Sequence, residues 1–368
     1  MKLLETSRDA LLAPLQAVSG VVERRHTLPI LANVLVETQQ GAAHFIATDL
    51  EIQISTRRKI SDGQADFSIT VSARKLQDIL RSLPDNAATV FESLDGRITL
   101  RAGKSRFSLQ TLPAADFPRL AATGAVQASC RIKQSILKAL FGKVQYAMAQ
   151  QDIRYYLNGL LMVLERELIR VVATDGHRLA YAHDMVDGPT SGLELILPRK
   201  AVIELSKLLT DTEDLVEIEV LPNLVRFRLA DIELVTKVVD GKFPDFNRVI
   251  PTNYTKGFQL NRQILLQALQ RASILSNEKF RGVRWIVLND RLRTICSNTE
   301  NEEAEEELEI AYTGEALDVG FNITYIMDVL NNIATDEIEC SLGDSSSSML
   351  MTVPGDDSFK YVVMPMRI

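Results

Sequence analysis

The sequence has 368 residues, of which 46% are hydrophobic and 24% are charged, so the chain can bury two or three ordinary hydrophobic cores. No apolar run approaches the roughly 20 residues that a membrane-spanning helix needs, and the N-terminal residues lack the apolar core of a signal peptide. The net charge of −7, taken alone, argues against a nucleic-acid partner.

The cysteine content indicates the compartment. Cys130, Cys296 and Cys340 are odd in number and lie far apart in the sequence. They form neither a disulfide framework nor a CxxC metal pair. Because this usage suits a reducing environment, we expect a cytoplasmic protein that does not associate with membranes.

The order of predicted elements repeats along the chain. A segment with helical apolar spacing precedes an extended segment that contains Thr48-Asp49, and the same order returns with Thr174-Asp175. The two aspartates are 126 residues apart (175 − 49), and in a weaker third copy Asn298 follows 123 residues later (298 − 175). The helices predicted at the start of the three copies span residues 9–22, 134–146 and 262–275.

Each copy also contains a second predicted helix, at residues 71–83, 197–209 and 321–333. In the middle one, Val202, Leu205 and Leu209 recur at helical spacing. Segments that alternate between apolar and polar residues follow each helix and are typical of half-buried strands. The pattern predicts an α+β fold of three tandem similar domains, each with two helix-plus-four-strand halves. We expect the domains at residues 1–126, 127–254 and 255–368.

Several strings spread over the full length carry a resemblance to a known family. They are TLPIL (27–31), SRFSLQTLPAADFP (105–118), QDIRYYLNG (151–159), ATDGHRLA (173–180), ILSNEKFRGVR (274–284) and YVVMPMRI (361–368). Together they resemble the DNA polymerase III beta subunits, the bacterial replication sliding clamps. The resemblance implies a homodimer closed head to tail into a six-domain ring. Such a ring encircles duplex DNA without sequence specificity and acts as a processivity factor, not as an enzyme.

Candidate DNA contacts come from two sources. Arg74-Lys75 and Arg199-Lys200 stand at the same place in two copies, 125 residues apart (199 − 74), which favours contact with phosphates for Arg74, Arg199 and Lys200. A solvated helix face remains the alternative for any one of them. The resemblance implies further DNA contacts by Arg25, Gln151, Tyr155, Tyr156 and Arg281. The two tyrosines occupy adjacent strand-like positions, so at most one of them faces the core.

Seven glutamates crowd residues 300–309. We expect them on the outside of the ring, where negative charge repels DNA and leaves the positive potential within the hole.

Ring closure needs two different complementary surfaces. The resemblance places them at Phe107 and Leu109 on one end of the subunit and at Ile274 and Leu275 on the other. SRFSL is expected to form a strand with Phe107 and Leu109 on one face. The alternative, that both side chains face the core of their own domain, stays open.

The resemblance also implies an apolar pocket that receives short peptides. Its expected partners are the DNA polymerase III alpha subunit, other polymerases, the clamp loader and repair proteins. The expected walls are Leu157, Thr174, Gly176, His177, Arg178, Leu179, Pro244, Arg248, Val249, Tyr325, Ser348, Val362, Met364, Pro365 and Met366.

An enzyme is the rival class of function. Asp175 and His177 resemble an acid–base or metal-binding pair. Thr-Asp recurs at Thr48-Asp49 without a histidine, however, so turn chemistry is the better interpretation. Residues 102–105 (AGKS) resemble the end of a phosphate-binding loop but are better explained as a hairpin turn. We therefore expect no catalytic residue, metal site or cofactor. A peptide-binding adaptor that does not encircle DNA is the remaining alternative.

Overall fold

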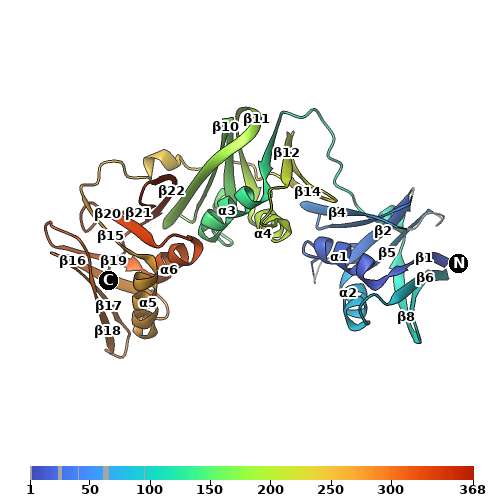
Figure 1. Ribbon diagram of the computed structural model, residues 1–368, viewed down its shortest axis with the longest axis horizontal. Helices are drawn as coiled ribbons and strands as arrows, with labels where there is room; N and C mark the ends of the chain where they lie inside the picture. The colour runs from blue at the N-terminus through green and yellow to red at the C-terminus, as the bar shows by residue number, and fades with distance from the viewer. Residues whose placement is uncertain (1, 24–26, 40, 61–65, 95) are drawn as a thin grey trace. The chain divides into compact units, whose positions relative to one another are not determined.

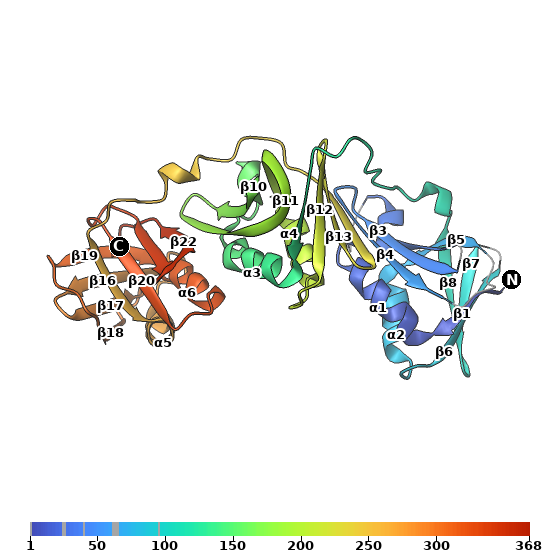
Figure 2. The same ribbon diagram turned by 45° about the horizontal axis from the view of Figure 1, so that its top comes forward.

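The computed structural model describes residues 2–23, 27–39, 41–60, 66–94 and 96–368 (Figures 1 and 2). It forms two compact units, the first made of residues 1–135, 187–190 and 203–238 and the second of residues 136–186, 191–202 and 239–368. No helix among the described residues is long and apolar enough to cross a membrane. Arg25, an expected DNA contact, lies outside the described residues.

The first unit is built from antiparallel strands and two helices that pack together, α1 (Arg8–Ser19) and α2 (Ala73–Ser82). Each helix begins where a serine hydroxyl accepts a backbone N–H: Ser7 accepts from Ala10 and Ser72 from Lys75. The strands are β1 (Lys2–Ser7), β2 (Asn33–Gln39), β3 (Ala42–Thr48), β4 (Ile52–Lys59), β5 (Phe67–Ser72), β6 (Ala88–Leu94), β7 (Arg97–Ala102), β8 (Ser105–Leu112), β9 (Ala128–Lys133), β12 (Leu215–Leu221), β13 (Leu224–Leu229) and β14 (Ile232–Lys237).

One strand pair joins segments of the first unit that lie far apart in the sequence. β4 pairs antiparallel with β14, from Ile52 opposite Thr236 to Thr56 opposite Ile232. Through this pair the series β4, β3, β2, β5 continues into the series β14, β13, β12, β9. A second series runs in the order β1, β6, β7, β8. The turn from β7 to β8 contains Gly103 with a φ of 56°, which confirms the hairpin expected at residues 102–105.

The second unit contains the long strand β10 (Gly159–Thr174) and most of β11 (Arg178–Pro198), whose residues 187–190 belong to the first unit. The helices α3 (Gln134–Val144) and α4 (Arg199–Leu208) also straddle the division between the units. Its other elements are β15 (Lys256–Asn261), α5 (Arg262–Ala272), β16 (Gly282–Leu288), β17 (Arg291–Ser297), β18 (Glu303–Glu309), β19 (Leu317–Asn322), α6 (Ile323–Asn332), β20 (Glu337–Leu342), β21 (Met349–Val353) and β22 (Asp356–Val363). A four-stranded sheet has the order β18, β17, β16, β19. The single tryptophan, Trp285, is fully buried in it.

The repeated Thr-Asp pairs form the same turn in both copies. The Thr48 hydroxyl donates to the Ile52 carbonyl at 2.8 Å, and the Thr174 hydroxyl donates to the Arg178 carbonyl at 2.6 Å. The carboxylate of Asp49 accepts two backbone N–H groups of its turn, and Asp175 does the same. Asn298 accepts two in the third copy. These bonds confirm the turn interpretation and occupy the carboxylate that resembled a catalytic group.

All three cysteines are buried and free. Among the described residues, no group of three His, Cys, Asp or Glu side chains gathers as metal ligands would.

Candidate functional site

Segments from the middle and the end of the chain meet where β11 pairs with β22. Leu179 lies opposite Val362 in this antiparallel pair. The chain after β22 continues the contact, because the backbone N–H of Met364 donates to the His177 carbonyl at 2.8 Å. The N–H of Met366 then donates to the Gly320 carbonyl of β19 at 2.8 Å. The last residues of the chain are therefore held against both the β11 turn and β19.

Several of the expected pocket residues share one apolar cluster. Leu157, Leu179 and Val362 are buried in it, and Val249 packs against it in a half-buried position. Half-buried side chains of Tyr325, Ser348, Met364, Pro365 and Met366 and the exposed residues Gly176, His177, Pro244 and Arg248 make up most of the remaining set. The structure thus brings four of the expected wall residues, Leu157, Leu179, Val249 and Val362, together in one cluster.

Arg178 differs from the other expected wall residues because its guanidinium is turned inward. The residue is 9% exposed, and its Nε donates to the Asp175 carboxylate at 3.1 Å. Its Nη1 donates to Asp328 on α6, and its Nη2 donates to the Tyr146 carbonyl at 2.7 Å. The guanidinium carbon lies 4.4 Å from the ring centre of Tyr325. Arg178 therefore supports a wall residue and does not offer its own charge to a ligand.

Sequence reasoning missed the partners of this arginine. Asp328 is 150 residues away in the sequence, and Tyr146 comes from the end of the preceding helical segment. Tyr361 was also missed, although its buried hydroxyl donates to the Tyr325 carbonyl at 2.9 Å. Burial raises the pKa of Tyr361, so the hydroxyl stays protonated and available as a donor. No local pattern in the sequence signals these contacts.

Side-chain hydrogen bonds of Asp152, Arg154 and Asn158 hold the loop that carries Gln151, Tyr155 and Tyr156. The Asn158 side chain accepts the N–H of Asp152 and donates to its carbonyl, each at 2.8 Å. Arg154 donates twice to the Asp152 carboxylate, at 3.0 and 2.8 Å, and its Nη2 also reaches the Asp175 carbonyl at 3.2 Å. The expected DNA-contacting loop is thereby tied to the turn that precedes β11.

The conformation of the tyrosine pair was wrongly expected to be strand-like. Tyr155 and Tyr156 lie in a short 3-10 helix, Tyr155–Leu157, whose backbone N–H groups bond within the turn. Tyr155 is 56% exposed, and Tyr156 is half-buried against the apolar cluster. The tight turn splits the two side chains between solvent and cluster, an outcome that strand alternation would also have produced.

The carboxyl of Asp152 provides a pH test of this loop. The Arg154 side chain lowers the pKa of Asp152 from 3.8 to about 2. Because the folded-state pKa is depressed, the stabilisation is complete above about pH 4 and is lost as the pH falls through about 2. Arg154→Gln should raise the pKa of Asp152 towards its ordinary value in a carboxyl NMR titration.

Asp344 is the matched control for that titration. Its pKa is also about 2, but the cause is hydrogen bonding from Ser346 and Ser347, so Arg154→Gln should leave it unchanged. An Asp152 carboxyl that titrates near 3.8 in the unsubstituted protein would contradict the assignment.

The basic residues predicted to contact phosphates have unlike surroundings. Arg74 is exposed on α2, and its Nε lies 3.7 Å from the carboxylate oxygen Oδ2 of Asp78. Arg199 is half-buried and donates to the Met148 carbonyl at 3.0 Å, and burial followed by the charge of Arg178 lowers its pKa. Lys200 is half-buried, whereas Arg281 is exposed with a φ of 51°. Arg74 and Arg199 occupy equivalent positions in the repeat, but the Arg74 side chain is exposed and that of Arg199 is half-buried.

The glutamate-rich segment forms β18, an edge strand of its sheet. Arg271 of α5 makes a bidentate ion pair with Glu306, at 2.8 and 2.6 Å. Arg293 of the neighbouring strand pairs with Glu305 at 2.6 Å. Part of the negative charge is therefore compensated within the unit, while the outward edge of β18 has no strand partner among the described pairings.

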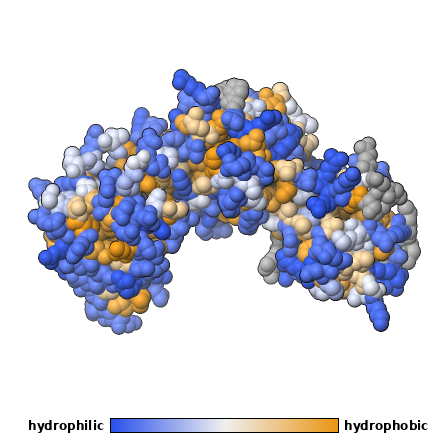
Figure 3. Space-filling view, viewed as in Figure 1, coloured by the Kyte–Doolittle hydropathy of each residue, from blue (hydrophilic) through white to orange (hydrophobic). Residues whose placement is uncertain are grey.

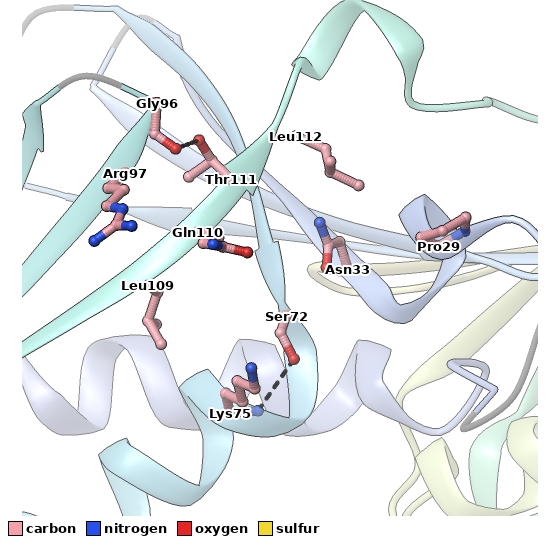
Figure 4. Close-up of a pocket in the computed structure, with 10 residues that line it drawn as sticks. All are labelled: Pro29, Asn33, Ser72, Lys75, Gly96, Arg97, Leu109, Gln110, Thr111 and Leu112. Carbon is pink, nitrogen blue, oxygen red and sulfur yellow. Dashed lines mark hydrogen bonds between the residues drawn. The ribbon is translucent and has the colours of Figure 1, made fainter.

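β8 is a second edge strand. In the described pairings its residues 105–110 bond only to β7. Phe107 is half-buried and Leu109 is buried on the same face, as expected for this strand. Beside it lies a cavity of about 460 Å³, with Leu109, Lys75 and Arg97 among its lining residues (Figure 4). The two cations are exposed, so this edge is basic where β18 is acidic.

Apolar residues on the surface occur as separate patches on the face drawn in Figure 3, which is otherwise mostly hydrophilic. Ile274 is 78% exposed in the 3-10 helix Ser273–Leu275 that follows α5, and Leu275 beside it is half-buried. This short helix lies against β18. Ile274 is therefore an exposed apolar side chain beside the unpaired edge of β18.

Comparison with family models matches nearly the whole chain. Residues 1–121 match the N-terminal domain of the DNA polymerase III beta subunit, residues 131–245 the central domain and residues 247–367 the C-terminal domain.

Two similar proteins share the description Beta sliding clamp. The Beta sliding clamp of Pseudomonas putida is 43% identical over 364 residues, and that of Escherichia coli K12 is 42% identical over 361 residues, each covering 98% of both chains. Among solved structures, the sliding clamp of Pseudomonas aeruginosa bound to griselimycin is 42% identical with a TM-score of 0.96, covering 100% of both chains. The pol III beta structure of Caulobacter crescentus is 37% identical with a TM-score of 0.92 at the same coverage.

Proposed function

This chain belongs to the DNA polymerase III beta subunit family, and from that premise we propose which of its surfaces carry the family's function. It is a DNA sliding clamp that supports polymerase processivity, and the family consists of accessory subunits that are not enzymes. The match to all three domain models along the chain is the observation that carries this conclusion.

For this chain we propose domains at residues 1–126, 127–254 and 255–368 and a head-to-tail dimer that closes a six-domain ring around duplex DNA. The order and approximate bounds of the three domain matches support the domain limits. The two unpaired edges support the mode of closure, since β8 is basic and β18 acidic and a strand edge favours addition of another strand. The glutamates of β18 then lie at the joint between subunits and not on the outside of the ring, where the sequence led us to expect them. The dimer operates in the cytoplasm.

We propose that Arg25, Arg74, Gln151, Tyr155, Lys200 and Arg281 contact DNA, with Arg199 and Tyr156 in supporting positions. Exposure of Arg74, Gln151, Tyr155 and Arg281 supports direct contact. The Arg199 guanidinium already donates a hydrogen bond to the Met148 carbonyl, which supports a role in positioning the DNA-contacting residues. Such contacts reach phosphates, so they carry no base readout.

Topological linkage is the decisive test of encirclement. The ring, loaded on nicked circular DNA by a clamp loader, should stay bound through high salt and leave when the DNA is linearised. Electrostatic binding alone falls steeply with salt, whereas a closed ring slides off only at an end. Loss of the protein from circular DNA at high salt would favour the adaptor that does not encircle DNA.

We propose that the apolar cluster with Leu157, Leu179, Val249 and Val362, together with the C-terminal tail, forms the pocket for short peptides of polymerases, the clamp loader and repair proteins. The packing of these side chains into one cluster, with Val249 half-buried at its surface, supports the proposal. A relative of the same fold, the P. aeruginosa clamp, has been solved bound to griselimycin. Flexible methionines at 364 and 366 suit varied peptides.

Gly320 gives a specific test of the tail. A Cβ added there would lie 2.5 Å from the Met366 carbonyl oxygen and 2.6 Å from the Ile368 side chain, so the tail must move. We expect Gly320→Ala to weaken binding of a partner peptide about tenfold, or about 1.4 kcal/mol, as measured by fluorescence anisotropy.

Gly142→Ala is the matched control, because a Cβ on this α3 residue meets nothing within 4 Å. It should leave peptide affinity unchanged. Equal peptide affinity of the Gly320→Ala and Gly142→Ala proteins would show that the C-terminal tail does not form part of the pocket.

A further inference from the structure

A second cavity, of about 320 Å³, lies within the first unit. Three residues of α1, Ala13, Pro14 and Ala17, line one side. Leu208 at the end of α4 and residues 229–232 of the β13–β14 turn also line it. Its volume falls at the lower end of the roughly 300–1,000 Å³ typical of small-molecule sites. The cavity shares no residue with the peptide pocket, the ring edges or the expected DNA contacts.

The cavity contains an unsatisfied polar group. Thr56 of β4 is 4% exposed, and its hydroxyl has no hydrogen-bond partner among the described residues. A buried hydroxyl without a partner is unusual in a native structure and favours a ligand that supplies the missing bond. Because side chains alternate along a strand, Thr56 and Arg58 project from the same face of β4.

The rim of the cavity is cationic. Arg58 lines it and is exposed, and its guanidinium has no ion-pair partner in the described part of the chain. Arg57 also lines the cavity but projects from the opposite face of β4, beside His44. Asp231 is the single acidic residue of the lining. A free guanidinium is the preferred protein partner of a carboxylate.

We propose that this cavity binds a small carboxylic acid with an apolar body. The hydrocarbon lies against Ala13, Pro14, Ala17 and Leu208, while the carboxylate accepts hydrogen bonds from the Thr56 hydroxyl and the Arg58 guanidinium. A DNA phosphate fits less well, because the apolar walls offer no hydrogen-bond partner to its sugar. The site is independent of the peptide pocket and is tested without DNA.

Octanoate is a suitable probe for calorimetric titration of the full-length protein. We expect saturable 1:1 binding per chain, weakened about tenfold by Thr56→Val, which keeps the shape and removes the hydroxyl, and about tenfold by Arg58→Gln. Asp231→Asn should tighten binding because it removes a like charge. The uncharged analogue 1-octanol should bind at least about tenfold more weakly than octanoate.

Two matched pairs control for unspecific effects. Ala17→Phe should abolish binding by filling the cavity, whereas Gln16→Phe adds the same side chain at the neighbouring exposed position of α1 and should not. Arg131→Gln removes an exposed arginine elsewhere in the first unit and should leave the affinity unchanged. Absence of saturable binding, equal binding of octanol, or full binding by Ala17→Phe would each overturn the proposal.

Discussion

Replacing Arg178 with alanine should lower the free energy of unfolding by about 3–5 kcal/mol. The substitution removes three hydrogen-bonding partnerships at once and leaves the carboxylates of Asp175 and Asp328 without their cation. It also removes the flat surface under the Tyr325 ring. Peptide affinity should fall as well, because Arg178 supports the ring of Tyr325, an expected wall of the pocket.

Urea denaturation followed by the fluorescence of Trp285 measures this effect, because the single tryptophan lies in the same unit as Arg178. Arg248→Ala is the control. That arginine is exposed and pairs with Asp245 at 3.1 Å on the surface, so its loss should change the free energy of unfolding by less than about 1 kcal/mol. Equal denaturation midpoints for the two variants would mean that the buried network does not stabilise the unit.

Combining Ile274→Ala with Leu275→Ala should convert the dimer into soluble monomers. Each large apolar side chain buried in an interface contributes about 1.5–3 kcal/mol, so the pair should raise the dissociation constant at least a hundredfold. Because Ile274 is 78% exposed within the chain, its removal should leave the fold of the subunit intact. Sedimentation velocity at micromolar concentration distinguishes the two species.

Ile153→Ala is the matched control for the interface. Ile153 is even more exposed, at 95%, but lies in the loop before Tyr155 and on neither proposed edge. It should stay dimeric. A stable dimer of the double variant would reject the assignment of residues 274 and 275 to ring closure, although it would leave the family membership untouched.

Local periodicity predicts the helices of this chain closely. The helix expected at residues 262–275 is α5 up to Ala272, followed by a 3-10 turn at residues 273–275. The difference arises because the last turn tightens, with the Ser276 N–H bonding to the Ser273 carbonyl. Repetition of the Thr-Asp pair likewise predicts the turn at Thr48 and Thr174, since its hydrogen bonds connect residues at most four apart.

Contacts between distant segments do not follow from such patterns. The pairing of β4 with β14 joins residues about 180 apart, and nothing in either strand identifies the other. Arg178 appears in the sequence as one more basic residue near a turn, while its buried position depends on Asp328 and Tyr146. Arg199 shows the same limit, because the repeat predicts a free charge where tertiary packing supplies the Met148 carbonyl.

The burial of the three thiols has a practical consequence for following this protein on DNA. Burial raises the pKa of Cys130 and of Cys296 to about 11, and it raises that of Cys340 further. The reactive thiolate is therefore almost absent at neutral pH. A single cysteine introduced at an exposed position such as Ile153 would take up a maleimide dye alone, without removal of the native cysteines.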